Sequence, residues 1–202
     1  MTTTLVLGQT LEFDANPMID GPGAARHRTR GAVLIKDGLI AEVGEASDLR
    51  VAHPQAQVTD YGNDLIMPGF IDAHAHYPQT AMIASWGKRL IDWLNDYTFP
   101  EEMRFSDPAY AHKIAERYFD LTLAHGTTTV ASYTTIDPGS VDAYFQAAQS
   151  RGLRALAGKT CMDRNAPAGL RDTAQSAYDD SKALLQRWHG QDRLSYVITP
   201  RF

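Results

Sequence analysis

Residues 65–76 have the sequence Leu-Ile-Met-Pro-Gly-Phe-Ile-Asp-Ala-His-Ala-His. The apolar first half predicts a buried strand, and the two histidines stand at its carboxyl end. Because side chains alternate between the faces of a strand, we expect His74 and His76 on one face, with Cα atoms roughly 6–7 Å apart. Two imidazoles at that separation can bind one metal ion. The stretch therefore predicts a barrel enzyme whose metal activates water.

The composition is typical of a globular protein, since 44% of the 202 residues are hydrophobic and 21% are charged. A net charge of -5 gives no support for nucleic-acid binding. No apolar run approaches the roughly 18 residues that span a bilayer, and the N-terminus lacks the pattern of a secretion signal. The single cysteine, Cys161, excludes an intrachain disulfide and fits a reducing cytoplasm. We expect it to be a buried structural thiol.

The first 64 residues predict a small β domain. A strand is expected at 5–13, a loop at 14–23, and another short strand at 57–61. Between them, residues 31–36 and 39–43 predict a hairpin, because Asp37-Gly38 supplies a two-residue turn. This part of the chain, 1–64, is therefore expected to be a separate β-rich domain.

From Leu65 onward the pattern changes to strands alternating with helices. Further strands are expected at 127–133, 153–159 and 194–199, and helices at 107–126, 140–151 and 173–189. In the first helix, Asp107 before Pro108 predicts a capped amino end. In the second helix, one face is expected to be apolar, with Val141, Tyr144, Phe145 and Ala148 on it. In the third helix, Asp172 and Gln175 predict a capping pair, and an apolar stripe is expected to face the core at Tyr178, Leu184, Leu185 and Trp188. Parallel strands joined by helices form a doubly covered sheet or a barrel. A complete eight-fold barrel takes about 250 residues, so 65–202 is expected to be the first half, with about four strands.

Several motifs along the chain are those of one enzyme family. The order of a β segment followed by residues 67–76 resembles the amidohydrolase superfamily. Within it, the chain resembles the guanine deaminases over essentially its whole length. The motifs that carry this resemblance are Tyr77-Pro78-Gln79-Thr80, Trp93-Leu94, Tyr97-Thr98-Phe99-Pro100-Glu101, Gly126-Thr127-Thr128-Thr129, Gly158-Lys159 with Met162-Asp163, and Thr199-Pro200-Arg201-Phe202.

The resemblance implies a β-sandwich-like domain built around a (β/α)8 barrel that holds one zinc ion. It implies hydrolytic removal of the 2-amino group of guanine, which gives xanthine and ammonia. It also implies a cytoplasmic protein that is a homodimer at full length, with a small purine substrate and without nucleic-acid or membrane partners. By motif position, the metal ligands would be His74 and His76, and the purine pocket would be lined by His76, Tyr77, Pro78, Gln79, Arg201 and Phe202.

The family's other metal ligands and its proton-transfer glutamate and histidine are expected beyond residue 202. No catalytic residue can therefore be assigned within 1–202, and we expect these residues alone to be inactive. Two alternatives stay open. One is another amidohydrolase, which acts on an aminotriazine, a pterin or an oxidised purine. The other is a non-catalytic assembly fragment.

Some single residues have two interpretations. Asp72 is expected on the face of the two histidines, where it either orients a ligand imidazole or is a structural carboxylate. Lys159 is expected to pair with a carboxylate such as Asp163. Trp86 is expected to be buried and to hold its loop against the protein. Trp93 and Tyr97 are either pocket wall or packing. The remaining histidines lack metal-ligand spacing and are expected to be structural or solvated: His27, His53, His112, His125 and His189.

Overall fold

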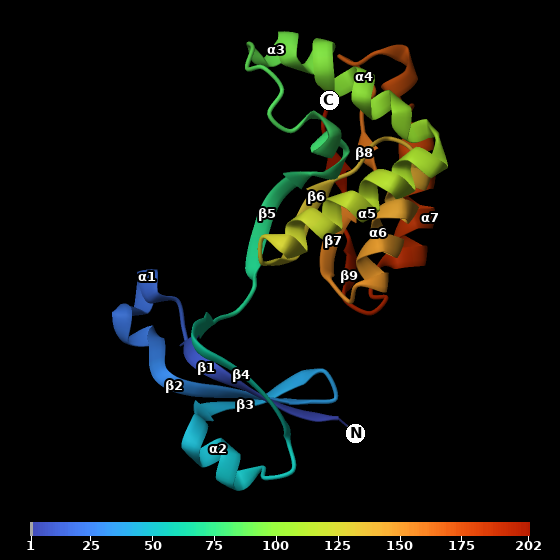
Figure 1. Ribbon diagram of the computed structural model, residues 1–202. Coiled ribbons are helices and arrows are strands. Elements are labelled where there is room, and N and C mark those ends of the chain that lie inside the picture. The colour runs from blue at the N-terminus through green and yellow to red at the C-terminus, as the bar shows by residue number, and fades with distance from the viewer. Residues whose placement is uncertain (1) are drawn as a thin grey trace. The chain divides into compact units, whose positions relative to one another are not determined.

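The computed structural model describes residues 2–202, which divide into two compact units. The first unit ends at Pro68 and the second runs from Gly69 to Phe202 (Figure 1). Each unit has its own sheet and its own core, and they are described separately below.

The first unit contains a four-stranded sheet in the order β3-β2-β1-β4. β1 pairs antiparallel with β2 and parallel with β4. The predicted hairpin is confirmed, because β2 and β3 pair around Asp37-Gly38, both of which have positive φ angles as the tight turn requires. The elements are β1 (Thr3–Phe13), α1 (Pro17–Asp20), β2 (Ala25–Lys36), β3 (Leu39–Glu45), α2 (Ala46–Ala52) and β4 (Gln57–Ile66).

The first unit differs from the sequence prediction at four places. β2 begins at Ala25, although its strand was expected to start at residue 31. The expected loop at 14–23 contains α1, whose amino end is capped by the Asn16 side chain accepting from the Met18 amide at 2.9 Å. The strand expected at 57–61 continues to Ile66. α2 was not predicted, and its Leu49 completes a small core with four sheet residues, Leu5, Leu7, Ala32 and Leu34.

The second unit is built on a parallel sheet in the order β5-β6-β7-β9, with helices between its strands. The predicted α/β class with about four parallel strands is thereby confirmed. A two-stranded parallel ladder, β8 with β10, continues beyond β7 and β9. The main elements are β5 (Phe70–His76), α5 (Pro108–Ala124), β6 (Thr127–Tyr133), α6 (Pro138–Ser150), β7 (Arg154–Gly158), β8 (Thr160–Cys161), α7 (Ala174–Trp188), β9 (Leu194–Tyr196) and β10 (Thr199–Pro200).

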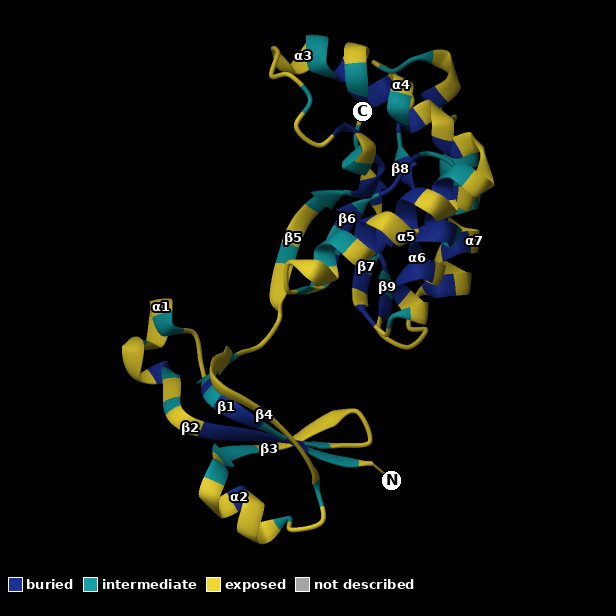
Figure 2. Cartoon of the chain, in the orientation of Figure 1, coloured by how far each residue is buried: buried dark blue, intermediate teal, exposed yellow. Residues whose placement is uncertain are grey.

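The core of the second unit lies between this sheet and the three long helices (Figure 2). The stripe predicted for α6 is confirmed, since Val141, Tyr144, Phe145 and Ala148 are all buried. In α5 the expected cap is also confirmed, because the Asp107 side chain accepts from the Ala109 amide at 2.9 Å.

The prediction for α7 is partly wrong. Leu184 and Trp188 are buried as expected, but Tyr178 and Leu185 are exposed. The amino end is capped one residue later than predicted, by a box in which the Thr173 and Ser176 side chains each bond the other's backbone amide. A short hydroxyl at each position makes this reciprocal pair possible.

The expectation of a buried strand over residues 65–70 is wrong. The apolar run is divided between the end of β4 and the start of β5, with 67–69 between them. Both strands lie at sheet edges, and Ile71 is 72% exposed. An edge strand has a sheet neighbour on one side only, so its apolar side chains are buried less than those of a central strand.

The segment from β5 to α5 is a chain of short helical turns. The expected packing of Trp86 is wrong, because its side chain is 80% exposed. Other residues of the segment do form a small core, in which Leu94 and Phe99 contact Met162 and Leu170. The turns are η2 (Tyr77–Met82), α3 (Leu90–Trp93), a π-helical turn (Leu94–Thr98), α4 (Phe99–Glu102) and η4 (Met103–Ser106); η1 (Pro22–Ala24) and η5 (Ala168–Leu170) lie elsewhere in the chain.

Lys159 pairs with a carboxylate, as expected, but the suggested partner Asp163 is wrong. The buried Lys159 ammonium donates to Asp172 at 2.6 Å, and Asp163 pairs instead with its exposed neighbour Arg164. A buried ammonium needs a carboxylate that is itself shielded from water, which Asp172 is and Asp163 is not.

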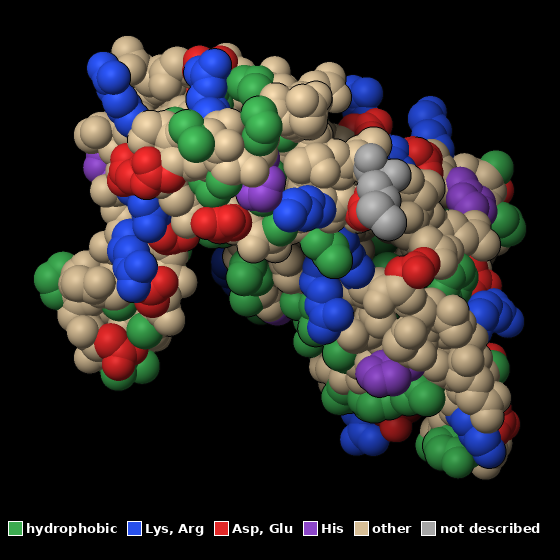
Figure 3. Space-filling model, turned by 90° about the horizontal axis from the view of Figure 1, so that it is seen from below, with side chains coloured by type: hydrophobic (Ala, Val, Ile, Leu, Met, Phe, Trp, Pro, Cys, Tyr) green, Lys and Arg blue, Asp and Glu red, His purple; other side chains and the backbone are tan. Residues whose placement is uncertain are grey.

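Basic and acidic side chains are interspersed on the face that Figure 3 shows. Within the described residues, no helix combines the length and the apolar composition that crossing a bilayer requires.

Candidate functional site

The two predicted metal ligands stand at the carboxyl end of β5, beside the end of β6. His76 is the register partner of Tyr133 on β6. The ring centroids of His74 and His76 are 5.3 Å apart, in an edge-to-face arrangement. Both rings also contact Tyr133, so both imidazoles project from the same side of the sheet.

β5 is irregular at the first histidine of this pair. The register shifts between Asp72, which pairs with Val130, and Ala75, which pairs with Ser132. Val130 and Ala75 both belong to the core under the helices, so Asp72 faces that core as well. Two residues three positions apart share a face only where a strand bulges.

The expectation that Asp72 shares a face with the histidines is therefore wrong. The bulge reverses the alternation, which turns the imidazoles of His74 and His76 to the opposite face. Asp72 accepts a hydrogen bond from the backbone amide of His74 at 3.1 Å. Its carboxylate therefore holds the backbone of the bulge rather than a ligand ring.

The His76 imidazole is stacked and desolvated. Its ring lies parallel to that of Tyr133, with a centroid distance of 4.5 Å and an interplanar angle of 6°. Burial, followed by the nearby charges of Arg201 and His74, lowers the pKa of His76 to about 4. The ring is therefore neutral at pH 7 and carries a nitrogen lone pair.

This environment fits a metal ligand. The Nδ1 atom of His76 is buried and has no hydrogen-bond partner among the described residues. A buried nitrogen without a partner is costly unless something else binds it. Neutral imidazole is a common ligand of Zn and of other first-row transition metals. Within residues 2–202, however, no three His, Cys, Asp or Glu side chains group closely enough to hold an ion.

Arg201 lies near enough to His76 for its charge to lower the pKa of that imidazole, and it is held by a buried carboxylate. Its Nη1 atom donates to both oxygens of Glu102, each at 2.8 Å. The side chains of Arg201 and Glu102 are 10% and 1% exposed, so this ion pair is buried and does not lie at the surface. Burial raises the pKa of Glu102, and the charge of Arg201 opposes that rise.

The other predicted pocket residues are divided between two environments. Gln79 and His76 both line a hollow of about 640 Å³ that also borders Trp93. Tyr77 instead lies in the core, with its amide donating to Ser132 Oγ at 3.0 Å and its hydroxyl to the Ser140 carbonyl at 2.7 Å.

Pro78 is buried, while Phe202 stands beside Arg201 with its ring 5.3 Å from the guanidinium carbon. The structure thus brings His74, His76 and Arg201 near one another. It places the Tyr77 side chain elsewhere, and neither Arg201 nor Phe202 borders the hollow of Gln79.

Sequence reasoning missed two residues of this site. Tyr133 ends the strand next to β5, and a residue at the carboxyl end of a neighbouring parallel strand is a reasonable site candidate. Glu102 carried no comparable signal, because it lies on a short helical turn whose position depends on tertiary packing.

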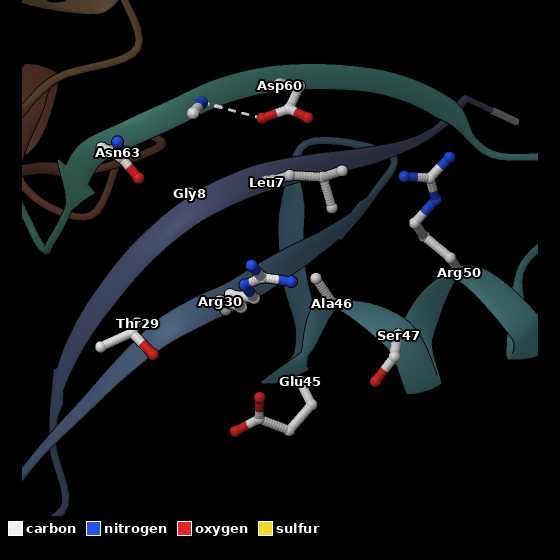
Figure 4. Close-up of a pocket in the computed structure, with 12 residues that line it drawn as sticks. Leu7, Gly8, Thr29, Arg30, Glu45, Ala46, Ser47, Arg50, Asp60 and Asn63 are labelled. Carbon is white, nitrogen blue, oxygen red and sulfur yellow. Dashed lines mark hydrogen bonds between the residues drawn. The ribbon is translucent and has the colours of Figure 1, made fainter.

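The first unit has a separate hollow, shown in Figure 4, to which we assign no ligand. It lies between β1, β2, β4 and α2, and its charged residues are of both signs, since Arg30 and Arg50 share it with Glu45 and Asp60. The hydrogen bond drawn there is internal to β4, from the Gly62 amide to Asp60 at 2.8 Å.

Comparison with known proteins gives two family matches. The model of the amidohydrolase family matches residues 65–198. The model of a bacterial imidazolonepropionase-like composite domain matches residues 31–56. Together they include parts of both structural units.

Among curated proteins, the chain is 44% identical over 195 residues to the guanine deaminase of Escherichia coli, an alignment that covers 94% of this chain and 44% of that protein. A crystal structure of guanine deaminase from Bradyrhizobium japonicum matches all of this chain and 44% of its own, with a TM-score of 0.95 and 37% identity. A guanine deaminase from C. acetobutylicum with guanine in its active site matches all of this chain and 46% of its own, with a TM-score of 0.86 and 29% identity.

The chain therefore spans less than half the length of these relatives. The family match covers most of the second unit, including β5 with its histidine pair and the parallel strands that follow. Members of this family use a metal cofactor, which agrees with the neutral, unpartnered imidazole of His76. On these grounds the chain belongs to the amidohydrolase family.

Proposed function

We propose that this chain carries part of the active site of a zinc-dependent guanine deaminase, which hydrolyses guanine to xanthine and ammonia. The observation that carries the proposal is the adjacent imidazole rings of His74 and His76 near a buried guanidinium, in a chain that resembles guanine deaminases over almost its whole length. Such a site combines metal ligands with a donor for a planar ring.

In this proposal each residue has a distinct task. His74 and His76 hold zinc, and the stacking of His76 on Tyr133 fixes the ring that carries the unpartnered Nδ1. Arg201 donates hydrogen bonds to acceptors on the purine, and the Phe202 ring covers a purine face.

Three further residues belong to the proposed pocket. The Gln79 amide bonds the edge of the base. Pro78 and the backbone of Tyr77 keep η2, and with it Gln79, next to His76.

The reaction consumes one water for each guanine and releases the 2-amino nitrogen as ammonia. A bound zinc ion supplies a nucleophile at neutral pH by lowering the pKa of water. The residues of this chain contribute position, because a ring held by Gln79, Arg201 and Phe202 presents one carbon to that nucleophile. No proton-transfer residue is assigned within residues 1–202.

The proposal includes the surrounding architecture. We take residues 1–64 as part of a β-sandwich-like domain and 65–202 as the first half of a (β/α)8 barrel. The parallel order of the second sheet and its alternating helices support this assignment. A homodimer at full length follows from the resemblance, and a cytoplasmic location from the resemblance and the single cysteine.

The function is tested by measuring ammonia release from a panel of substrates. The panel contains guanine, an aminotriazine, a pterin and an oxidised purine, offered to the longest natural polypeptide that contains these residues and to residues 1–202 alone. We expect the longer polypeptide to prefer guanine and residues 1–202 to be inactive. A preference for another substrate, or no turnover of any, would contradict the assignment.

The metal site is tested by replacing one ligand. We expect His76→Ala to reduce the zinc content of the longer polypeptide, measured by elemental analysis, together with its deaminase activity. The matched control is His112→Ala, an exposed histidine on α5, which should leave both unchanged. Full zinc occupancy in the His76 variant would remove that residue from the ligand set.

A further inference from the structure

Glu102 is the most deeply buried acidic residue in the part of the chain that the structure describes. It closes the short helix α4, and its partner Arg201 follows 99 positions later in the sequence. A carboxylate is not buried without a counter-charge, because the loss of hydration is too costly. The position of Arg201 is therefore tied to that of Glu102.

The contact uses only one edge of the guanidinium. Both Glu102 oxygens lie 2.8 Å from the same nitrogen, Nη1, which carries two of the five N–H groups of an arginine. The other three are on Nε and Nη2, and no atom of residues 2–202 accepts a hydrogen bond from them. A purely structural pair commonly uses two nitrogens in a fork, so this pair leaves a donor edge unused.

The rest of the Arg201 side chain is held in place as well. The guanidinium carbon lies 5.9 Å from the Phe99 ring centre and 5.3 Å from that of Phe202, within the range of cation–π attraction. The Arg201 amide donates to the Cys161 carbonyl at 3.0 Å, which fixes the backbone end. Glu102 fixes the other end.

We infer that Glu102 is a positioning residue that holds the Nε and Nη2 edge of Arg201 toward the substrate. The inference rests on the proposed function and goes beyond it, because it assigns the specificity of the guanidinium to a carboxylate that does not touch the substrate. The ligand that fits this edge is a planar ring with two neighbouring acceptors, such as O6 and N7 of guanine.

The test compares guanine with 2-aminopurine, which keeps the reacting amine but lacks O6. In the longest natural polypeptide that contains the chain, we expect E102Q to lower the kcat/KM ratio of guanine over 2-aminopurine by at least about tenfold, with zinc content unchanged. R201A should lower this ratio by the same factor. The double variant E102Q/R201A should have the same ratio as R201A alone. The control E116Q, which removes an exposed carboxylate paired with Arg151, should leave the ratio unchanged.

Two results would overturn the inference. One is an unchanged ratio in E102Q. The other is an equal loss of kcat/KM for guanine and 2-aminopurine, which a general loss of folding would also give. If E102Q does not fold, E102D decides, because it keeps the charge but moves the carboxylate by one methylene; its ratio should fall between those of wild type and R201A.

A second measurement separates this inference from the proposed function. ¹⁵N relaxation of the Arg201 Nε group in the 202-residue chain should indicate a rigid guanidinium in the wild type and a mobile one in E102Q. Equal rigidity in both would overturn the positioning role. Absence of guanine turnover by the wild type, with the NMR difference present, would overturn the proposed function alone.

Discussion

Gly158 ends β7 at a point where any side chain would meet the neighbouring strand. A Cβ atom there would lie 1.8 Å from the Val197 carbonyl oxygen and 2.8 Å from Thr199 Oγ1. The adjacent backbone is held by a hydrogen bond from the Val197 amide to Ala157 at 2.8 Å, so it cannot move away freely. We expect Gly158→Ala to lower the free energy of unfolding by about 2–3 kcal/mol, measured by urea denaturation.

Gly139 is the matched control for that substitution. A Cβ atom on this residue of α6 would meet nothing within 4 Å. Gly139→Ala should therefore be neutral or stabilise by up to about 1 kcal/mol, because alanine favours a helix over glycine. Equal losses in the two variants would contradict the steric argument.

Lys159 and Asp172 form a pair that is almost fully shielded from water. Replacing only the lysine, as Lys159→Met, leaves a shielded carboxylate without its partner and should cost about 3–5 kcal/mol. The double variant Lys159→Met/Asp172→Leu should recover most of that loss, as measured by chemical denaturation. A surface control, Asp163→Ala, should leave the unfolding midpoint unchanged, since its pair with Arg164 is exposed.

Single residues were predicted best where their role depends on near neighbours in the sequence. The adjacent rings of His74 and His76 followed from strand alternation, and the Asp107 cap from its position before Pro108. The partner of Lys159 could not be predicted, because Asp172 is brought to it by a loop that packs through Leu170. Local patterns specify local contacts, and long-range partners follow from the fold.

At the scale of the element, the cap of α7 gives a direct test. Thr173 accepts from the Ser176 amide at 3.0 Å, and Ser176 accepts in return from the Thr173 amide. We expect Thr173→Ala to lower the free energy of unfolding by about 1 kcal/mol. Gln175→Ala is the control, because its side chain bonds only exposed Asp179 and should have little effect. A larger loss of unfolding free energy in Gln175→Ala than in Thr173→Ala would instead favour the Asp172 and Gln175 pair as the cap.

The strands show why the element types were predicted better than their burial. Alternation and β-branched residues located β6, β7 and β9 correctly. The apolar run at 65–70 was assigned to one buried strand, although it belongs to the ends of two edge strands. Sequence pattern indicates that a residue is apolar, but the neighbouring elements determine how much of it is covered.

At the scale of the whole molecule, buried tyrosines predict the response to alkaline pH. Burial raises the pKa of Tyr77, Tyr118 and Tyr144 above the ordinary value near 10. Because the folded pKa is higher than the unfolded one, their contribution to stability is complete below about pH 10 and is lost as the pH rises further. We expect the melting temperature, followed by circular dichroism, to fall above about pH 10 together with the appearance of phenolate absorbance.

One variant identifies the group responsible. The Tyr144 hydroxyl has no hydrogen-bond partner among the described residues, so Tyr144→Phe should preserve the fold. It should also move the alkaline transition to higher pH. Tyr178→Phe removes an exposed hydroxyl and should leave the transition where it is. A shift only in the Tyr178 variant would contradict burial as the cause.

For the chain as a whole, the class of fold followed from the order of strands and helices, and the family from the motifs around His74 and His76. The arrangement around Arg201 did not follow, because its partner Glu102 comes from a helical turn that periodicity does not reveal. The helix α2 was missed for a similar reason, since it is short and only its Leu49 is buried.

The bulge between Asp72 and Ala75 limits how the chain length can vary at this point. Deleting Ala73 would remove the bulge, and either the imidazoles or the residues before them would then turn to the other face of the sheet. A substitution at the same position would leave the bulge, and so the faces of these side chains, unchanged. Changes of side chain are therefore compatible with a working site here, but an insertion or deletion of one residue is not.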